Sequence, residues 1–189
     1  MINYVQGDAT DPKTPGNKII AHVCNDIGGW GRGFVLSLSK KWKDPELMYR
    51  RWYQEGADML LVPGESDLTI GVPLQLNEVM FVPVDYKGSP PDFDEMTYVA
   101  NMVAQHGVLP KDDGTQPIRY GALEACLQQV KKFVDHIGGA SVHMPRIGCG
   151  LAGGKWSEIE PIIERALVDV DVYVYDFDTK DARTVPWNK

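Results

Sequence analysis

Two kinds of apolar pattern follow one another along this chain. In the first, a short run is almost continuously apolar, and KIIAHVC at residues 18–24 is the clearest case. Such a run is typical of a strand that is covered on both faces. By the same criteria we predict further strands at residues 2–5, 68–72, 79–84, 98–105, 141–146 and 172–177.

Several of these segments leave a choice open. Residues 98–105 fit a helix as well as a strand, and we favour the strand. Residues 68–72 and 79–84 are expected to pair with each other. Loops are predicted at YKGSPPDFDE, residues 86–95, and at GVLPKDDGTQP, residues 107–117, because both segments are rich in turn-forming residues.

In the second pattern, apolar residues recur every three or four positions, as on one face of a helix. Residues 118–137 give the longest example, and two glycines follow it. Its apolar stripe consists of Leu123, Leu127, Val130 and Val134. The apolar positions of a shorter predicted helix, residues 34–42, are Phe34, Leu38 and Trp42.

Capping signals mark two further helices. Asp44 is expected to cap a helix that has Pro45 in its first turn and stops at Gly56. Ser157 is expected to cap a helix over residues 157–168, with a glutamate three residues later completing a capping box.

Strands alternate with helices through most of the chain, and this alternation predicts an α/β fold. We expect a three-layer α/β/α sandwich, in which helices cover both faces of a mixed sheet of about six strands. No internal repeat, low-complexity tract or long linker divides the sequence. Residues 1–189 are therefore expected to form one domain with a short polar tail from about residue 178.

Charge narrows the range of partners. With 26 acidic and 19 basic residues the formal net charge is -7, and such a surface repels nucleic acids and anionic membranes. The densest basic cluster, Lys40, Lys41 and Lys43, adjoins acidic residues. The sequence contains no apolar run of membrane-spanning length and no signal-peptide pattern, so we expect a cytoplasmic protein.

The three cysteines give no sign of a metal site. Cys24, Cys126 and Cys149 are far apart and do not have the spacing of zinc ligands. We expect small buried or loop thiols, and we predict neither a metal nor a cofactor.

Two glycine-rich segments carry the strongest functional signal. IAHVCNDIGGWGRGF at residues 20–34 and RIGCGLAGGKW at residues 146–156 each lie between a predicted strand and a predicted helix. Open α/β sheets bind ligands at this position, and bare backbone amides there can hold a phosphate. Neither spacing matches a dinucleotide fingerprint or a P-loop. The alternative is that the glycines only form tight turns.

Four motifs in order resemble the macrodomain family: GDAT, IIAHVCNDIGGWGRGF, MPRIGCGLAGG and VYVYDF. The resemblance covers nearly the whole chain. It points to the branch that contains the yeast ADP-ribose-1''-phosphate phosphatase and the terminal ADP-ribose glycohydrolase. The pattern H-x-C-N-x-x-G-x-W-G-x-G is similar to the phosphatase, and MPRIGCGL is similar to the glycohydrolase.

The resemblance implies ADP-ribose or an ADP-ribose derivative as the ligand. The first glycine loop would wrap the distal ribose, and the second would hold the diphosphate. Asp8 would accept a hydrogen bond from adenine, with a turn-forming aspartate as the alternative. Tyr175 and Phe177 are candidates for stacking on adenine, with core packing as the alternative for each. The implied ligand-binding residues are Asp8, Ala9, Gly28, Gly29, Trp30, Gly31, Arg32, Gly33, Phe34, Arg146, Ile147, Gly148, Cys149, Gly150, Leu151, Ala152, Gly153, Tyr175 and Phe177.

Three residues are catalytic candidates under this resemblance. His22 matches a histidine of the phosphatase and would shuttle a proton near neutral pH, with a satisfied strand histidine as the alternative. Asn25 matches an asparagine that contacts the distal ribose. Asp26 could orient a water molecule or be a plain loop carboxylate. In addition, Trp30 is expected to wall the ribose pocket, with a simple hydrophobic lid as the alternative. Arg32 either pairs with a phosphate or points to solvent.

The chain also departs from the glycohydrolase. Ala152 replaces its aspartate, and the segment VANMVAQHG at residues 99–107 lacks its catalytic lysine. Within that segment Gln105 and His106 could face the ligand. Cys149 precedes a helix, where its pKa could fall, although we expect an inert loop residue.

The functional prediction is a hydrolase acting at the distal ribose, with ADP-ribose 1''-phosphate as the simplest substrate. The alternatives are a non-catalytic reader of ADP-ribose and a hydrolase that removes ADP-ribose from a macromolecule.

Overall fold

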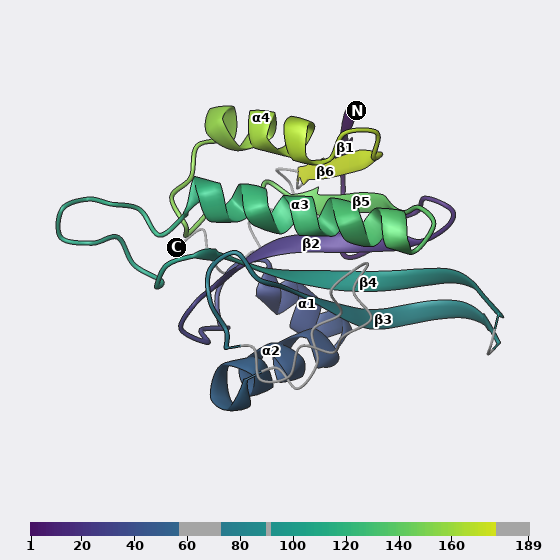
Figure 1. The fold of residues 1–189 in the computed structure, drawn as a ribbon, viewed down its shortest axis with the longest axis horizontal. Helices are drawn as coiled ribbons and strands as arrows, with labels where there is room; N and C mark the ends of the chain where they lie inside the picture. The colour runs from purple at the N-terminus through teal and green to yellow at the C-terminus, as the bar shows by residue number, and fades with distance from the viewer. Residues whose placement is uncertain (57–72, 90–91, 177–189) are drawn as a thin grey trace.

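The computed structural model describes residues 1–56, 73–89 and 92–176. For residues 86–89 and 92–94 it describes the backbone alone. Six strands form one sheet in the order β1-β6-β5-β2-β4-β3 (Figure 1). Their bounds are β1 Ile2–Gln6, β2 Lys18–Asn25, β3 Val79–Ser89, β4 Asp92–Gln105, β5 Ser141–Pro145 and β6 Val172–Asp176. Neighbouring strands are parallel, except that β3 runs antiparallel to β4 at the edge.

Helices cover both faces of this sheet. Helices α1 (Val35–Lys41) and α2 (Asp44–Glu55) lie on one side, while α3 (Tyr120–His136) and α4 (Trp156–Ala166) lie on the other (Figure 1). The predicted three-layer α/β/α sandwich with a mixed sheet is therefore confirmed.

Strand β2 shows why the sheet is buried on both faces. Ile19 and Ala21 belong to the apolar cluster formed with α3 and α4, whereas Ile20 and Cys24 belong to the cluster formed with α1 and α2. Successive side chains of a strand point to opposite faces, so a strand between two helical layers has to be apolar at nearly every position. This explains the run KIIAHVC.

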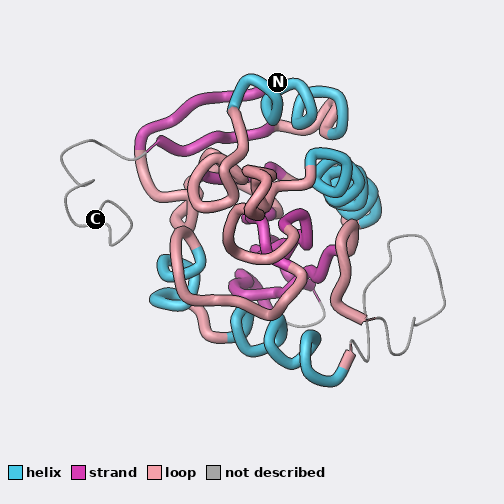
Figure 2. Tube along the Cα trace, turned by 90° about the vertical axis from the view of Figure 1, so that its left-hand side faces the viewer, coloured by secondary structure: helices cyan, strands magenta, loops and turns pink. Residues whose placement is uncertain are grey.

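The carboxyl ends of the parallel strands all meet at one edge of the sheet. The segments that follow β1, β2, β4 and β5 therefore gather there, between the two helical layers, as Figure 2 shows. The turn between α3 and β5, which contains Gly138 and Gly139, lies at the opposite edge. Loops of distant sequence thus meet at one place on the molecule.

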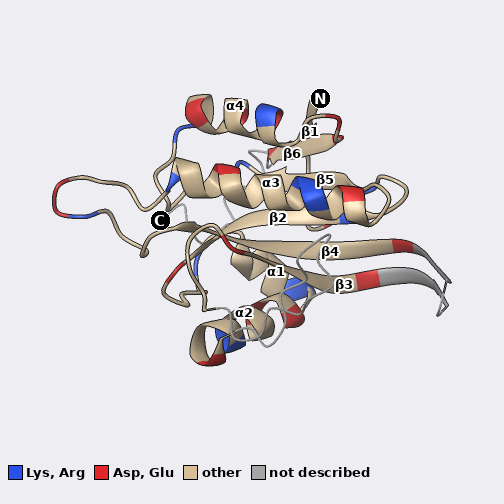
Figure 3. Ribbon diagram, viewed as in Figure 1, with Lys and Arg blue, Asp and Glu red and all other residues tan. Residues whose placement is uncertain are grey.

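Charged residues of both signs are interspersed along the helices (Figure 3). Several form ion pairs one helical turn apart, such as Arg51 with Glu55 and Lys131 with Asp135. No described helix is both long enough and apolar enough to cross a membrane.

Some local predictions are wrong. The segment YKGSPPDFDE is not simply a loop, because β3 continues to Ser89 and β4 begins at Asp92. Asp44 and Ser157 do not cap their helices: the caps are Lys43 and Lys155, without side-chain capping bonds. The predicted strand 68–72, its pairing with 79–84, and the polar tail lie outside the described residues.

Candidate functional site

Asn25 shapes the first glycine loop. It ends β2, and its Oδ1 accepts hydrogen bonds from the amides of Ile27 (3.2 Å) and Gly29 (2.8 Å), while its Nδ2 donates to the Gly29 carbonyl at 2.6 Å. The Tyr49 hydroxyl donates to the Asn25 carbonyl at 2.5 Å. The amide group of Asn25 therefore folds the loop back on itself.

Glycine is required at two positions of this loop. Gly28 has a φ of 71°, and a Cβ atom there would lie 2.4 Å from the Tyr53 ring. Gly33 has a φ of 80°, and a Cβ atom there would lie 3.9 Å from Leu151 of the second glycine loop. The two loops therefore lie side by side, as their shared sheet edge requires.

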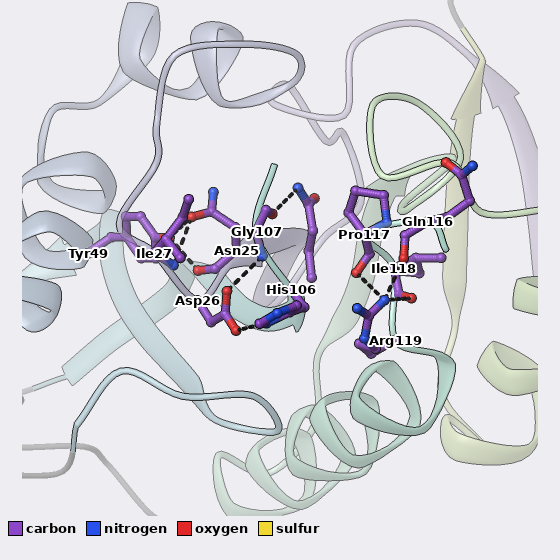
Figure 4. Close-up of polar contacts among 11 residues, drawn as sticks. Asn25, Asp26, Ile27, Tyr49, His106, Gly107, Gln116, Pro117, Ile118 and Arg119 are labelled. Carbon is purple, nitrogen blue, oxygen red and sulfur yellow. Dashed lines mark hydrogen bonds and ion pairs between the residues drawn. The ribbon is translucent and has the colours of Figure 1, made fainter. Parts of the chain in front are cut away.

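Asp26 links the first loop to the end of β4. Its Oδ2 lies 2.6 Å from His106 Nδ1, and its Oδ1 accepts a 2.8 Å hydrogen bond from the Gly107 amide (Figure 4). Burial by itself raises the pKa of Asp26, but the hydrogen bonds from Gly107 and His106 and the charge on His106 together lower it below its usual value. Asp26 is therefore ionised at neutral pH.

A chain of backbone hydrogen bonds continues from His106 to the second glycine loop. The His106 amide donates to the Pro117 carbonyl at 2.8 Å, and the Ile118 amide donates to the Ala152 carbonyl at 3.0 Å. Figure 4 shows Pro117 and Ile118 beside His106. Hydrogen bonds therefore connect the contact between Asp26 and His106 to both glycine loops.

The second loop is compact at its base. The Gly154 amide donates to the Gly148 carbonyl at 2.8 Å, and a Cβ atom on Gly154 would lie 2.7 Å from that same oxygen. Gly148 and Gly153 both have positive φ, of 70° and 71°. Ile147 and Ala152 are buried, whereas Gly150 and Leu151 are exposed. A side chain at Gly148, Gly153 or Gly154 would therefore clash with neighbouring atoms.

Two residues of this loop carry functional groups of their own. Partial burial raises the pKa of Cys149, and the charge of Arg146 lowers it by less. The suggested fall in the Cys149 pKa is therefore wrong, which agrees with an inert thiol. Arg146 forms a bidentate ion pair with Asp176, at 2.6 and 2.8 Å, and its guanidinium lies over the rings of Tyr4 and Trp156.

His22 is buried in the core, against Trp30 and Phe34 of the first glycine loop. It is 2% exposed, its Nε2 lies 2.6 Å from Asn101 Oδ1, and the Trp30 ring meets it edge-on at 5.4 Å. Burial lowers the pKa of His22 to about 4 despite the hydrogen bond to Asn101. The prediction that His22 titrates near neutral pH is wrong, and the alternative of a satisfied strand histidine fits its surroundings.

Trp30 is also part of the core. It is buried against Tyr49, and its Nε1 donates to Ser39 Oγ at 2.8 Å. Next to it, Gly31 and Arg32 are exposed, while Phe34 is partly buried and contacts His22. Trp30 thus anchors the first loop to the core, and Arg32 is exposed to solvent.

The residues predicted around adenine lie at the ends of β1 and β6. Asp8 is exposed and its Oδ1 accepts a 2.8 Å hydrogen bond from the Thr10 amide, next to buried Ala9. Tyr175 is partly buried, with its hydroxyl 3.0 Å from His143 Nδ1. Burial raises the pKa of Tyr175, and the nearby charges, including those of Asp11 and Asp8, raise it further by less. Phe177 lies outside the described residues.

Sequence reasoning did not identify two supporting aromatic residues or the partner of Asp26. Tyr49 and Tyr53 come from α2 and looked like ordinary helix residues. His106 was noted only as a residue that could face the ligand. Its separation of 80 residues from Asp26 leaves no local signal for their contact.

Two curated proteins illustrate what the sequence is similar to. No family model matches the chain. The mouse chromodomain-helicase-DNA-binding protein 1-like is 30% identical over 96% of this chain, but the match spans only 18% of that protein. An ADP-ribose 1''-phosphate phosphatase from Scheffersomyces stipitis is 26% identical over 92% of this chain and 99% of its own.

Solved structures give higher identities. A protein of unknown function from Bacteroides thetaiotaomicron is 47% identical, with a TM-score of 0.74 over 93% of this chain and 98% of its own. A macrodomain protein from Streptomyces coelicolor is 41% identical, with a TM-score of 0.67 over 93% and 99%. Thermosipho africanus DarTG, solved in complex with ADP-ribose, shares the fold at 16% identity, with a TM-score of 0.58 over 89% of this chain and 41% of its own.

The Streptomyces match, at 41% identity, extends over almost the full length of both chains. This chain belongs to the macrodomain family.

Proposed function

We propose that this macrodomain binds ADP-ribose and hydrolyses a derivative at the distal ribose, with ADP-ribose 1''-phosphate as the simplest substrate. The observation that carries the proposal is the meeting of the two glycine loops at the carboxyl edge of the sheet, where Gly33 approaches Leu151. Ionised Asp26 lies at the base of the same site.

The chemistry of the loops suits a nucleotide diphosphate. Backbone amides can approach an anion closely where side chains are absent, and they stabilise it without a positive net charge. This matters in a protein with a net charge of -7, because the overall field repels anions. The dipoles of the backbone amides in the two loops overcome that repulsion at short range.

The relatives support the same ligand. A protein named ADP-ribose 1''-phosphate phosphatase aligns over nearly its whole length, and a protein of the same fold has been solved with ADP-ribose. For hydrolysis, groups that transfer a proton have to be held near the distal ribose. Asp26 is ionised and adjoins the loop that is expected to wrap this ribose, whereas His22 is buried behind Trp30.

A reader of ADP-ribose without turnover is the second candidate. Residues 99–107 contain no lysine, and Gln105 at the end of β4 donates to the Gly107 carbonyl at 2.8 Å. A mechanism that needs a lysine there has no support in this chain. The 30% identity to a segment of a much longer mouse protein is also compatible with a binding module.

Phosphorus NMR of the protein with ADP-ribose 1''-phosphate tests both candidates together. We expect inorganic phosphate to appear while ADP-ribose accumulates. Perturbed diphosphate signals without phosphate release would support the reader. An unchanged spectrum would contradict ligand binding altogether.

Two glycines provide a matched pair of variants for this experiment. Gly154→Ala, in the second loop, places a methyl group 2.7 Å from the Gly148 carbonyl oxygen, whereas Gly121→Ala, at an exposed position of α3, meets no atom within 4 Å. We expect G154A to weaken ADP-ribose binding at least tenfold, the equivalent of about 1.4 kcal/mol. G121A should bind within about twofold of the wild type.

A further inference from the structure

We propose that His106 is the proton-transfer residue of this hydrolysis and that Asp26 positions it. The inference rests on the proposed function and assigns a role within it to a side chain that directly follows β4. It replaces the histidine that the sequence favoured, His22, with one that the fold brings to the site from elsewhere in the chain.

The contact between Asp26 and His106 is held from several sides. Asp26 Oδ2 lies 2.6 Å from His106 Nδ1, and the Gly107 amide occupies Oδ1 at 2.8 Å. The Asp26 amide in turn donates to the Gln105 carbonyl at 3.0 Å. Figure 4 shows the carboxylate and the imidazole pointing toward one another. Backbone on both sides therefore fixes the position of the carboxylate relative to the ring.

This geometry selects one tautomer of His106. An ionised carboxylate can only accept hydrogen bonds, so Nδ1 must carry a proton and donate it to Asp26. When the imidazole is neutral, its Nε2 then has a free lone pair. Among the described residues, Nε2 has no hydrogen-bonding partner, and the His106 side chain is 47% exposed. A water molecule or a substrate oxygen can therefore reach this nitrogen.

The pair borders both the ligand loop and an opening to solvent. A Cβ atom on Gly29 would lie 3.3 Å from Val108, so the segment after His106 touches the first glycine loop. A surface hollow of about 480 Å³ is lined by Asp26 together with Leu74, Gln75, Leu76, Asn77 and Glu78. The pair thus adjoins both the first glycine loop and a hollow open to solvent.

The other three of the four histidines do not offer this combination. His22 and His143 are buried, and burial lowers the pKa of each to about 4, with the charge of Lys18 contributing at His143. His136 is exposed but ends α3, at the opposite edge of the sheet. Only His106 is both accessible and paired with a carboxylate at the site.

The step balances with water as the only co-reactant. His106 Nε2 accepts a proton from water as the water oxygen forms a bond to phosphorus. The bond between phosphorus and the O1'' atom breaks, and its electron pair leaves with O1''. The protonated imidazole, stabilised by Asp26, then gives its Nε2 proton to O1'', which yields ADP-ribose and phosphate and restores the neutral ring.

The decisive experiment compares His106→Ala with the wild type, using ADP-ribose 1''-phosphate and the full chain. We expect H106A to lose a factor of about 10² to 10⁴ in kcat, the range for removal of a general acid–base, while its affinity for ADP-ribose stays within about threefold. Added imidazole should restore part of the turnover of H106A. His136→Ala is the matched control and should turn over like the wild type.

Nitrogen-15 NMR of the ligand-free protein tests the positioning role of Asp26 without any turnover. The wild type should show a protonated Nδ1 and an unprotonated Nε2 on the neutral ring of His106, and Asp26→Asn should weaken that preference and lower kcat. If Asp26 only supported the structure, Asp26→Asn would change the stability of the protein and leave the tautomer of His106 unchanged.

The outcomes separate the inference from the proposed function. If H106A turns over as fast as the wild type, the role of His106 is refuted and the hydrolase remains. If the wild type binds ADP-ribose but releases no phosphate, the hydrolase and the role of His106 both fall and the reader remains. If ADP-ribose does not bind, the proposed function fails as well.

Discussion

At the scale of single residues, Gly28 shows how tightly the first loop depends on a missing side chain. Its φ of 71° disfavours any other residue, and Tyr53 occupies the space that a Cβ atom would need. We expect Gly28→Ala to lower the free energy of unfolding by about 1–2 kcal/mol from the backbone conformation alone, and by more where the tyrosine ring has to move.

Thermal unfolding measures this effect directly. A loss of about 1–2 kcal/mol corresponds to a Tm lower by about 2–8 °C for a chain of this size. Gly31→Ala is the control in the same loop, because Gly31 does not have a positive φ and a Cβ atom there would meet nothing within 4 Å. Equal Tm values for the two variants would refute the argument.

Two buried histidines predict how stability depends on pH. Burial lowers the pKa of His22 and of His143 to about 4, whereas an unfolded histidine titrates near about 6.5. The unfolded chain therefore binds more protons between these values, and acid favours unfolding. Stability from these groups is complete above about pH 6.5 and is lost as the pH falls toward about 4.

Urea unfolding at about pH 7.5 and about pH 5 tests this expectation, because most carboxylates stay ionised across that window. Each histidine should cost about 2 kcal/mol at the lower pH. His143→Asn removes one buried imidazole and should reduce the pH dependence by about half. His136→Gln, at an exposed position, should leave it unchanged.

At the scale of elements, helix α3 fixes one helical layer to the sheet. Leu127 on its apolar stripe is fully buried, whereas the neighbouring Gln128 is exposed. We expect Leu127→Ala to lower the free energy of unfolding by about 2–5 kcal/mol through lost burial and a residual cavity. Gln128→Ala should change it by less than about 0.5 kcal/mol, and comparable losses in chemical denaturation would mean that the stripe does not carry the packing.

Periodicity predicted most elements because burial imposes it. Strand β2 lies between two helical layers, whereas helix α3 packs one face on the sheet. Apolar residues therefore occupy nearly every position of β2 and every third or fourth position of α3. The hairpin of β3 and β4 was missed where its sequence reads Pro, Gly and acidic residues, since pairing with a neighbouring strand outweighs local propensity. The helix caps at Asp44 and Ser157 were predicted wrongly because a capping signal is local and does not fix where a helix begins. The observed helices begin at Asp44 and Trp156, one residue before the predicted starts at Pro45 and Ser157.

The candidate site was predictable only in part. The two glycine loops are visible in the sequence because the glycines are contiguous with strand patterns. The partnership of Asp26 with His106 is not, since it depends on β2 and β4 being neighbours in the sheet. Burial of His22 was equally hidden, because a motif match says nothing about which side of a strand faces an aromatic cluster.

At the scale of the whole molecule, a ligand that binds the folded loops stabilises every element at once. ADP-ribose at about 100 times its Kd should raise the free energy of unfolding by about 2.7 kcal/mol. Calorimetry of the wild type with ADP-ribose, and with inorganic phosphate alone as a control, measures this gain. The proposed binding would be contradicted by a Tm that ADP-ribose does not change.

The gathering of the ligand loops at one edge of the sheet has a practical consequence. The turn at Gly138 and Gly139 lies at the other edge, is exposed, and has open space around both residues. A fluorophore or a solid support attached there would leave the loop edge directed toward the sample. The protein is therefore suited to serve as an oriented capture reagent, whose attachment chemistry can be changed without altering its recognition surface.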